Sequence, residues 1–191
     1  YALNWMSLLV VRDWRTRVVL EASNYTEFSK AIKEEHQYLD VIVLDLDMIS
    51  EFNRVANEIN QYALKARQKP KVIALASTGN SAFFRAIEPN LIAGYLLKSE
   101  ISMSLGWAIS FASENDHVFT PNALDYAFKA NFQPGKNKVI MRSRKYPGLT
   151  DRQSEIARLA IIFSIGRRDL ADELKISDQW SYGVVSELYT Q

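Results

Sequence analysis

The sequence predicts a doubly wound parallel sheet followed by a small all-α helix-turn-helix domain. Two observations support this fold class. In the first part of the chain, short apolar runs rich in β-branched residues alternate with segments of helical periodicity, a pattern typical of a parallel sheet with helices on both faces. In the last part, three short helical segments follow one another with tight connections, a geometry that lets one helix enter a DNA groove.

The strand predictions rest on the apolar runs. Residues 40–46 read DVIVLDL and are expected to form a strand that is buried on both faces. We expect further strands at 17–22, 71–76 and 91–97, and helices at 3–10, 25–36, 49–66, 81–87 and 101–113. Sites in such sheets lie beyond the carboxyl ends of the strands, so polar residues there are the candidates for function.

The middle of the chain is expected to connect two domains. Residues 115–120 are predicted to turn, 121–132 to form a short helix that Pro121 opens, and 133–147 to form a linker with a Pro-Gly pair near each end. The expected parts are therefore a sheet domain at 1–115, a helix and basic linker at 116–148, and a helical domain at 149–191. The sheet domain is expected to need one more strand before Leu3.

The C-terminal helices carry start signals and apolar faces. Thr150 and Gln153 have the spacing of a capping box, Ser177 is expected to cap the third helix, and Gly166 is expected to end the first. The side chains expected to face inward are Ile156, Leu159, Ala160 and Phe163 in the first helix, Leu170, Ala171 and Leu174 in the second, and Val184, Val185 and Leu188 in the third.

Composition excludes several classes of protein. Hydrophobic residues make up 48% of the 191 residues, enough for packed cores, and no apolar run is long enough for a membrane span. The absence of cysteine excludes disulfides and thiolate chemistry and fits a cytoplasmic protein. His36 and His117 lack a metal-ligand spacing, and no phosphate-binding glycine loop or catalytic triad pattern occurs. We therefore expect the chain not to be an enzyme.

Residues 149–191 resemble the LuxR-type helix-turn-helix domain of bacterial response regulators. The resemblance rests on 149–152 (LTDR), 169–174 (DLADEL) and the Ile-Ser pair at 176–177. It implies that Gln179, Tyr182, Gly183 and Ser186 face the DNA bases. Arg152, Arg167 and Arg168 lie at the edges of this unit and are the expected phosphate contacts. The family's fourth helix, used for dimerisation, is expected to be missing after the third.

The charge distribution places the cations outside the predicted reading helix. Residues 131–148 hold five basic residues and no acidic one: Lys136, Lys138, Arg142, Arg144 and Lys145. They indicate either phosphate contacts or a solvated linker. No Lys or Arg occurs between Ser177 and Gln191. Because cations supply most non-specific affinity for DNA, we expect a monomer to bind DNA weakly and a dimer or a partner to strengthen binding.

Two residues of the third helix have alternative interpretations. Trp180 either packs into the small core, which is the favoured interpretation, or is exposed as a partner surface or an apolar wedge. Gly183 is unusual inside a helix, where glycine costs about 1 kcal/mol relative to alanine. It either permits close approach to a base edge or is tolerated variation, and the second interpretation is slightly favoured.

The region before residue 115 resembles the receiver domain of response regulators. The resemblance rests on 40–45 (DVIVLD), on 94–98 (GYLLK) and on the strand expected between them. It implies that Asp45 is a phosphoryl acceptor, that Lys98 pairs with the phosphoryl group and that Tyr95 is the switch aromatic. The family's hydroxyl residue falls on Ala76, and a shift of one residue would place Ser77 there.

The resemblance leaves the signal open. Phosphorylation would require Mg²⁺, held by Asp45 with acidic residues expected before Tyr1; Asp47 is either a further ligand or a solvated acid. Without phosphorylation no cofactor is expected. The domain is therefore either a working phospho-receiver or, as Ala76 and the unusual loop after Asp45 favour, an atypical receiver used for dimerisation or another signal.

Together these observations predict a DNA-binding transcriptional regulator of the two-component type, in which the receiver-like domain controls dimerisation and DNA binding. The partners implied are promoter DNA, a second copy of the chain, and a sensor kinase or RNA polymerase; no membrane partner is expected. The alternative is a protein-interaction module whose helix-turn-helix binds a protein rather than DNA.

Overall fold

The computed structural model describes residues 2–11, 13–34, 39–101, 104–114, 117–142, 148–157 and 167–188. The chain divides into two compact units, Tyr1–Ser143 and Arg144–Gln191. Each unit contains a hydrophobic cluster of its own. Among the described residues, no helix is both long and apolar enough to cross a membrane.

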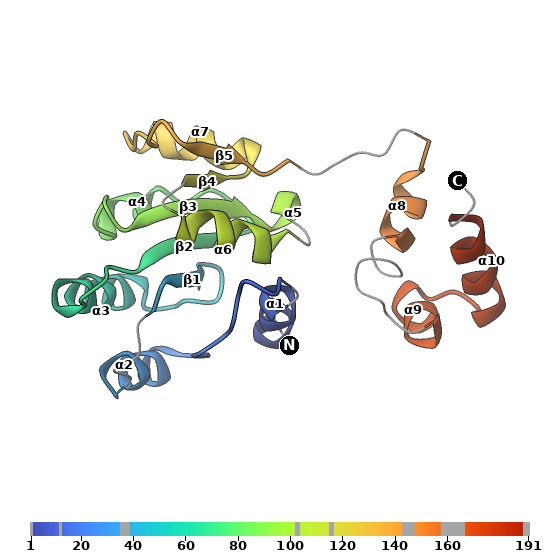
Figure 1. Ribbon diagram of the computed structural model, residues 1–191, viewed down its shortest axis with the longest axis horizontal. Helices are drawn as coiled ribbons and strands as arrows, with labels where there is room; N and C mark the ends of the chain where they lie inside the picture. The colour runs from blue at the N-terminus through green and yellow to red at the C-terminus, as the bar shows by residue number, and fades with distance from the viewer. Residues whose placement is uncertain are drawn as a thin grey trace. The chain divides into compact units, whose positions relative to one another are not determined.

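The first unit is an α/β domain built on an all-parallel sheet (Figure 1). Its strands lie side by side in chain order: β1 (Val41–Asp45), β2 (Lys71–Ala76), β3 (Ile92–Leu97), β4 (His117–Phe119) and β5 (Lys138–Ile140). Its helices are α1 (Ala2–Val11), α2 (Tyr25–Glu34), α3 (Phe52–Lys65), α4 (Ser81–Ala86), α5 (Lys98–Ile101), α6 (Leu105–Ser113) and α7 (Pro121–Lys129).

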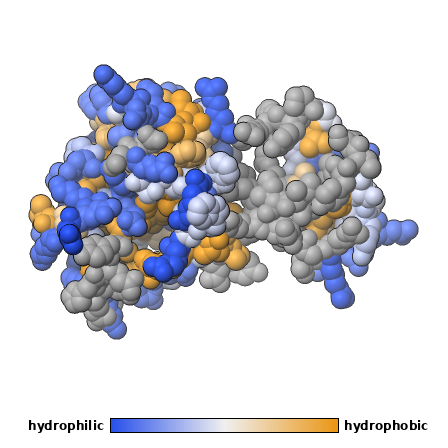
Figure 2. Space-filling view, in the orientation of Figure 1, coloured by the Kyte–Doolittle hydropathy of each residue, from blue (hydrophilic) through white to orange (hydrophobic). Residues whose placement is uncertain are grey.

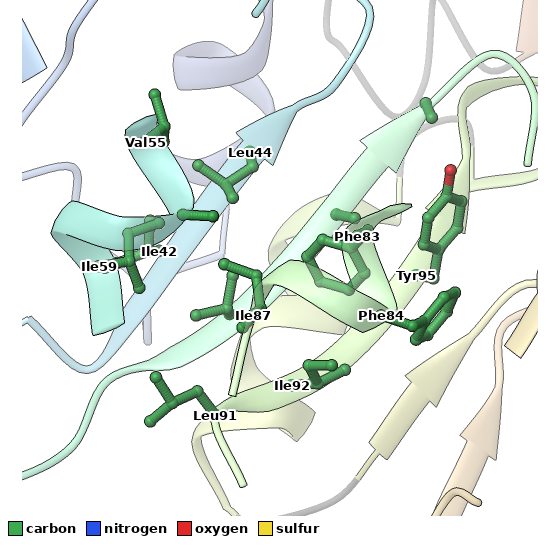
Figure 3. Close-up of a cluster of buried hydrophobic side chains, with 14 of the residues drawn as sticks. Ile42, Leu44, Val55, Ile59, Phe83, Phe84, Ile87, Leu91, Ile92 and Tyr95 are labelled. Atoms are coloured by element: carbon green, nitrogen blue, oxygen red, sulfur yellow. The ribbon is translucent and has the colours of Figure 1, made fainter. Parts of the chain in front are cut away.

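Helices cover both faces of this sheet, as the apolar runs predict. On one face, α3, α4 and α7 pack on alternate strand residues such as Val72 and Ala74, forming the cluster in Figure 3. On the other, α6 packs against α1 and crosses β1, β2 and β4. The residues between, such as Ile73, are also fully buried, so the central strands are apolar on both sides.

The prediction of a strand at 17–22 is wrong. The segment has no regular secondary structure, although Val18, Leu20 and Ala22 are half-buried and their neighbours exposed. The strand-like pattern of this segment therefore does correspond to alternating burial. A strand also needs a hydrogen-bonded neighbour, and none of the described strands pairs with this segment. The helices expected at 3–10, 25–36 and 49–66 are confirmed in the described residues as α1, α2 and α3.

The region after residue 115 extends the sheet, which the sequence did not predict. Residues 117–119, expected to turn, form β4, and residues 138–140, expected to belong to a linker, form β5. Both strands have only three residues, too few for a periodic signal. The helix predicted from Pro121 is confirmed as α7, which packs on β3 and α4. The first unit consequently runs to Ser143.

The described residues of the second unit form three short helices: α8 (Asp151–Ala157), α9 (Arg167–Leu174) and α10 (Asp178–Leu188). Ile156, Leu170 and Val185 meet in its core, with Ile176 and Val184 packed against them. Both predicted caps are confirmed. The Thr150 amide donates to Gln153 Oε1 (2.8 Å) and the Gln153 amide to Thr150 Oγ1 (3.2 Å), while the Trp180 amide donates to Ser177 Oγ (3.2 Å). Leu159, Ala160, Phe163 and Gly166 lie outside the described residues.

Candidate functional site

A cluster of polar side chains lies at the carboxyl ends of three neighbouring strands. Asp45 is the last residue of β1, Ser77 follows β2, and Lys98 follows β3, while Asp47 lies in the turn after β1. Parallel pairing brings these ends to one edge of the sheet. The structure therefore brings together the residues predicted as acceptor and pairing cation.

Lys98 binds both carboxylates of the cluster. Its Nζ lies 2.6 Å from Asp45 Oδ1 and 2.8 Å from Asp47 Oδ2. Asp45 is buried, and its Oδ1 also accepts the Asp47 amide at 3.2 Å. A single ammonium thus offsets the charge of two carboxylates that would otherwise repel each other.

Ser77, rather than Ala76, supplies a hydroxyl to the cluster. Ala76 ends β2 and is buried. The Ser77 hydroxyl donates to Asp47 Oδ2 at 2.6 Å, and its amide donates to the same oxygen at 2.8 Å. The hydroxyl is therefore bound to Asp47, the acid next to the predicted acceptor.

The contacts within the cluster shift the pKa values of Asp47 and Lys98. Burial alone would raise the pKa of Asp47, but hydrogen bonds from Lys98 and Ser77 outweigh it and hold that pKa below the usual value. Burial alone would lower the pKa of Lys98, but its bonds to Asp45 and Asp47 raise it. Lys98 and Asp47 are consequently both charged at neutral pH.

Tyr95 is fully buried, and its hydroxyl is bound to the loop after β2. The ring stacks on Phe84, with centroids 5.4 Å apart, and Figure 3 shows the hydroxyl pointing away from the apolar cluster. The hydroxyl donates to the Thr78 carbonyl (2.9 Å) and accepts from the Asn80 amide (2.8 Å). Burial raises the pKa of Tyr95 to about 12. The predicted switch aromatic is thus held inward, against the loop that begins at Ser77.

The residues present do not fit a resident Mg²⁺. The site has two carboxylates, Asp45 and Asp47, but both form ion pairs with the Lys98 ammonium. No group of three or more histidine or acidic side chains suited to a metal occurs in the described ranges. A divalent ion would have to displace the Lys98 ammonium, so no chemistry is assigned to a metal at this site.

Sequence reasoning missed the contact that covers the loop after β2. The Tyr126 ring of α7 lies directly on Gly79, where a Cβ would stand 2.1 Å from Cδ1 of that ring. The same loop is bound at Ser77 by Asp47 and at Thr78 and Asn80 by Tyr95. The Ser-Thr-Gly-Asn run signals a turn, but nothing in the sequence indicates that Tyr126 would cover it.

In the second unit, the predicted reading residues share the outward side of α10. Gln179, Tyr182, Gly183 and Ser186 are all exposed. Ser181 and Val185, on the opposite side of the same helix, are buried. The predicted set is therefore accessible on one continuous helix surface.

The predicted phosphate contacts lie on other elements. Arg152 on α8 and Arg168 on α9 are exposed, as are Lys136, Lys138 and Arg142 of the first unit. The side chain of Arg167 and all of Arg144 and Lys145 lie outside what the structure describes. The exposed residues of α10 include Asp178 and Glu187 and no cation.

The expectation that Trp180 packs into the small core is wrong. Trp180 is 46% exposed, and the core residues that the structure describes in this unit are Ile156, Leu170 and Val185. Trp180 instead lines a hollow of about 510 Å³ on α10 together with Ser177, Gln179, Gly183, Val184 and Glu187. No atom would meet a Cβ at Gly183 within 4 Å, so the helix is open at that position.

Comparison with known proteins does not assign the chain to a family. No family model matches it, and no curated protein sequence matches it.

Proposed function

We propose that the protein is a DNA-binding transcriptional regulator in which a receiver-like first unit controls dimerisation and DNA binding by a helix-turn-helix second unit. The observation that carries the proposal is the outward side of α10. It presents Gln179, Tyr182, Gly183 and Ser186 together, on a helix that Ser177 caps and that packs on α8 and α9 through Val185. A helix held in this way can enter the major groove and read base edges.

Affinity is proposed to come from cations outside α10. A reading helix without Lys or Arg adds specificity but little attraction to phosphate. Arg152 and Arg168 supply positive charge within the second unit, and Lys136, Lys138 and Arg142 supply it at the end of the first. Each phosphate that these residues neutralise strengthens binding and makes it more sensitive to salt.

A second copy of the chain is the proposed source of the remaining affinity. Several large apolar side chains are exposed. They are Leu8 (56%) and Val11 (53%) on α1, Trp14 (91%) in the turn that follows α1, and Trp107 (58%) on α6. Figure 2 shows apolar atoms at the surface of the first unit in several places. Exposed apolar surface of this kind favours contact with another protein. Two copies would present two reading helices to one operator.

The site at the ends of β1, β2 and β3 is proposed to set the conformation of the first unit. The family resemblance makes Asp45 a phosphoryl acceptor, with Lys98 as the balancing cation. We favour a signal that does not involve phosphorylation, because Lys98 binds both acids and the Ser77 hydroxyl is already bound to Asp47. We propose a cytoplasmic regulator with an atypical receiver.

Intact mass measurement after incubation with acetyl phosphate and Mg²⁺ separates the two signals. Phosphorylation would join an Asp45 oxygen to phosphorus and release acetate, which adds one phosphoryl group to the protein. The atypical receiver is expected to show no Asp45-dependent mass gain. A gain in the unmodified chain that disappears in Asp45→Ala, but persists in Asp40→Ala, would overturn the atypical assignment. Asp40 is exposed and precedes the same strand, so it is a matched control.

A protein-binding second unit is the alternative function, and the exposed Trp180 with Glu187 favours it specifically. An exposed aromatic ring beside a carboxylate suits a cationic protein side chain. DNA binding and protein binding on α10 differ in their response to salt and in the variants that abolish them. Fluorescence anisotropy over a range of salt concentrations measures this difference.

A further inference from the structure

We propose that the hollow over Gly183 receives the methyl group of a thymine, which makes α10 a reader of A·T base pairs. This inference rests on the proposed function, since it names the DNA sequence class that the second unit would select. It uses the two features of α10 that sequence reasoning had left open, the exposed Trp180 and the glycine in the middle of the helix.

Gly183 lies at the centre of the outward side of α10. Residues three and four positions apart are neighbours on a helix surface, so Gln179, Trp180, Ser186 and Glu187 surround it. All four are exposed. Gln179, Trp180 and Glu187 line an open depression with Gly183 between them, and no atom lies within 4 Å of where a Cβ at Gly183 would stand.

The walls of the hollow are chemically unequal. Trp180 and Val184 make one side apolar, and Gln179 places an amide at the end nearer the start of the helix. In the major groove, the one apolar group among the base edges is the thymine methyl, and an amide pairs bidentately with adenine. An apolar recess beside an amide thus matches a thymine next to an adenine.

The same surface disfavours guanine. The commonest specific contact to guanine is bidentate pairing by Arg or Lys, and α10 has neither. A helix surface without a cation, with an apolar recess at its centre, selects against guanine on the strand that α10 reads.

The stability and the DNA affinity of Gly183→Ala together distinguish a functional glycine from one that is merely tolerated. Alanine is a better helix former than glycine, and a Cβ at this position meets nothing. Gly183→Ala is therefore expected to make the protein more stable while filling the floor of the recess. If Gly183→Ala stabilises the fold but weakens DNA binding, the empty space at residue 183 contributes to DNA binding.

The experiment starts with the full chain and a library of duplexes with a randomised core. Enriched duplexes are then synthesised with single thymines replaced by deoxyuridine, which removes the methyl and keeps base pairing. We expect A·T pairs in each enriched half-site and one thymine whose replacement weakens binding about fourfold, the value of one buried methyl. Deoxyuridine in the flanking sequence is the control and should have no effect.

Three variants then assign the methyl to the hollow. Gly183→Ala should raise the unfolding midpoint, weaken binding about fourfold and abolish the difference between thymine and deoxyuridine. Trp180→Ala should abolish the same difference. Ser154→Ala, which improves helix propensity on α8 and leaves the residues that line the hollow unchanged, should leave it unchanged.

The outcomes separate this inference from the function on which it rests. Enriched duplexes that bind equally well with deoxyuridine at every thymine would overturn the thymine recess while leaving DNA binding intact. Undiminished binding by a stabilised Gly183→Ala variant would overturn it as well. A selection that enriches no duplex would overturn both the recess and the proposed DNA binding.

Discussion

Lys98 Nζ lies 2.6 Å from Asp45 Oδ1, and this ion pair joins the ends of two strands that are separated by β2. Asp45 is buried, so the pair is a structural bond as well as the centre of the candidate site. Lys98 extends it to Asp47, and Asp47 binds Ser77. The loops that follow β1 and β2 are thereby connected to the end of β3 by one cation.

Replacing Lys98 with methionine should destabilise the first unit measurably. The change keeps the length of the side chain but leaves the buried Asp45 carboxylate without its cation, a loss of about 1–3 kcal/mol for a partly exposed partner. The free energy of unfolding in urea measures it. Lys33→Met is the control, because Lys33 pairs with Glu58 at 3.0 Å with its side chain 62% exposed, and such pairs contribute about 1 kcal/mol or less. Equal losses in the two variants would contradict a structural role for Lys98.

Stability should depend on pH through the same ion pairs. The folded pKa of Asp47 is lowered, so its stabilisation is present above the usual value of 3.8 and is lost as pH falls through the lowered pKa. The folded pKa of Lys98 is raised, so its stabilisation is present below 10.5 and is lost as pH rises through the raised pKa. The difference in unfolding free energy between the unmodified chain and Asp47→Asn should be constant at neutral pH and shrink in acid. A difference that persists unchanged in strong acid would contradict the pairing.

Gly94→Ala should disrupt the pairing of β3 with β4. A Cβ at Gly94 would lie 2.4 Å from the Val118 carbonyl oxygen, which is backbone and cannot rotate away. We expect a loss of about 1–3 kcal/mol or more and faster amide exchange in β4 and β5. Gly183→Ala is a matched control of opposite sign, since a Cβ there meets nothing. Normal stability in Gly94→Ala would show that β4 does not pair as described.

Gly79→Ala should be destabilising only while Tyr126 is present. The new methyl would overlap the Tyr126 ring, whose Cγ and Cδ1 atoms would lie 2.2 and 2.1 Å away. In a double-mutant cycle, Tyr126→Ala should remove most of the penalty of Gly79→Ala, with a coupling of about 1–3 kcal/mol. Additive losses would mean that Tyr126 does not cover the loop in solution.

The central strands and the helix caps could be predicted from the sequence, because each has a recognisable pattern of residues. The runs that form β1, β2 and β3 are continuously apolar because both faces of these strands are covered, and their carboxyl ends locate Asp45 and Lys98. The Thr150–Gln153 and Ser177 caps are local hydrogen bonds, so sequence spacing is enough to predict them.

The remaining features depend on partners that are distant in sequence. β4 and β5 are too short for a periodic pattern and exist through pairing with β3 and with each other. Residues 17–22 have a strand-like pattern of burial and no pairing partner among the described strands. Likewise, the position of Trp180 depended on which side of α10 the other helices cover, and the described core residues of that unit lie on the side of Ser181 and Val185.

Fluorescence anisotropy of the full chain with its enriched duplex, measured over a range of salt concentrations, tests the central claim most directly. We predict salt-sensitive binding that Arg168→Ala with Tyr182→Ala abolishes. Arg168→Ala alone should reduce the logarithmic salt slope by about 1. Lys65→Ala, which removes an exposed cation of α3 in the first unit, should leave the slope unchanged. Absence of DNA binding, together with salt-insensitive association of the second unit with a protein, would contradict the account.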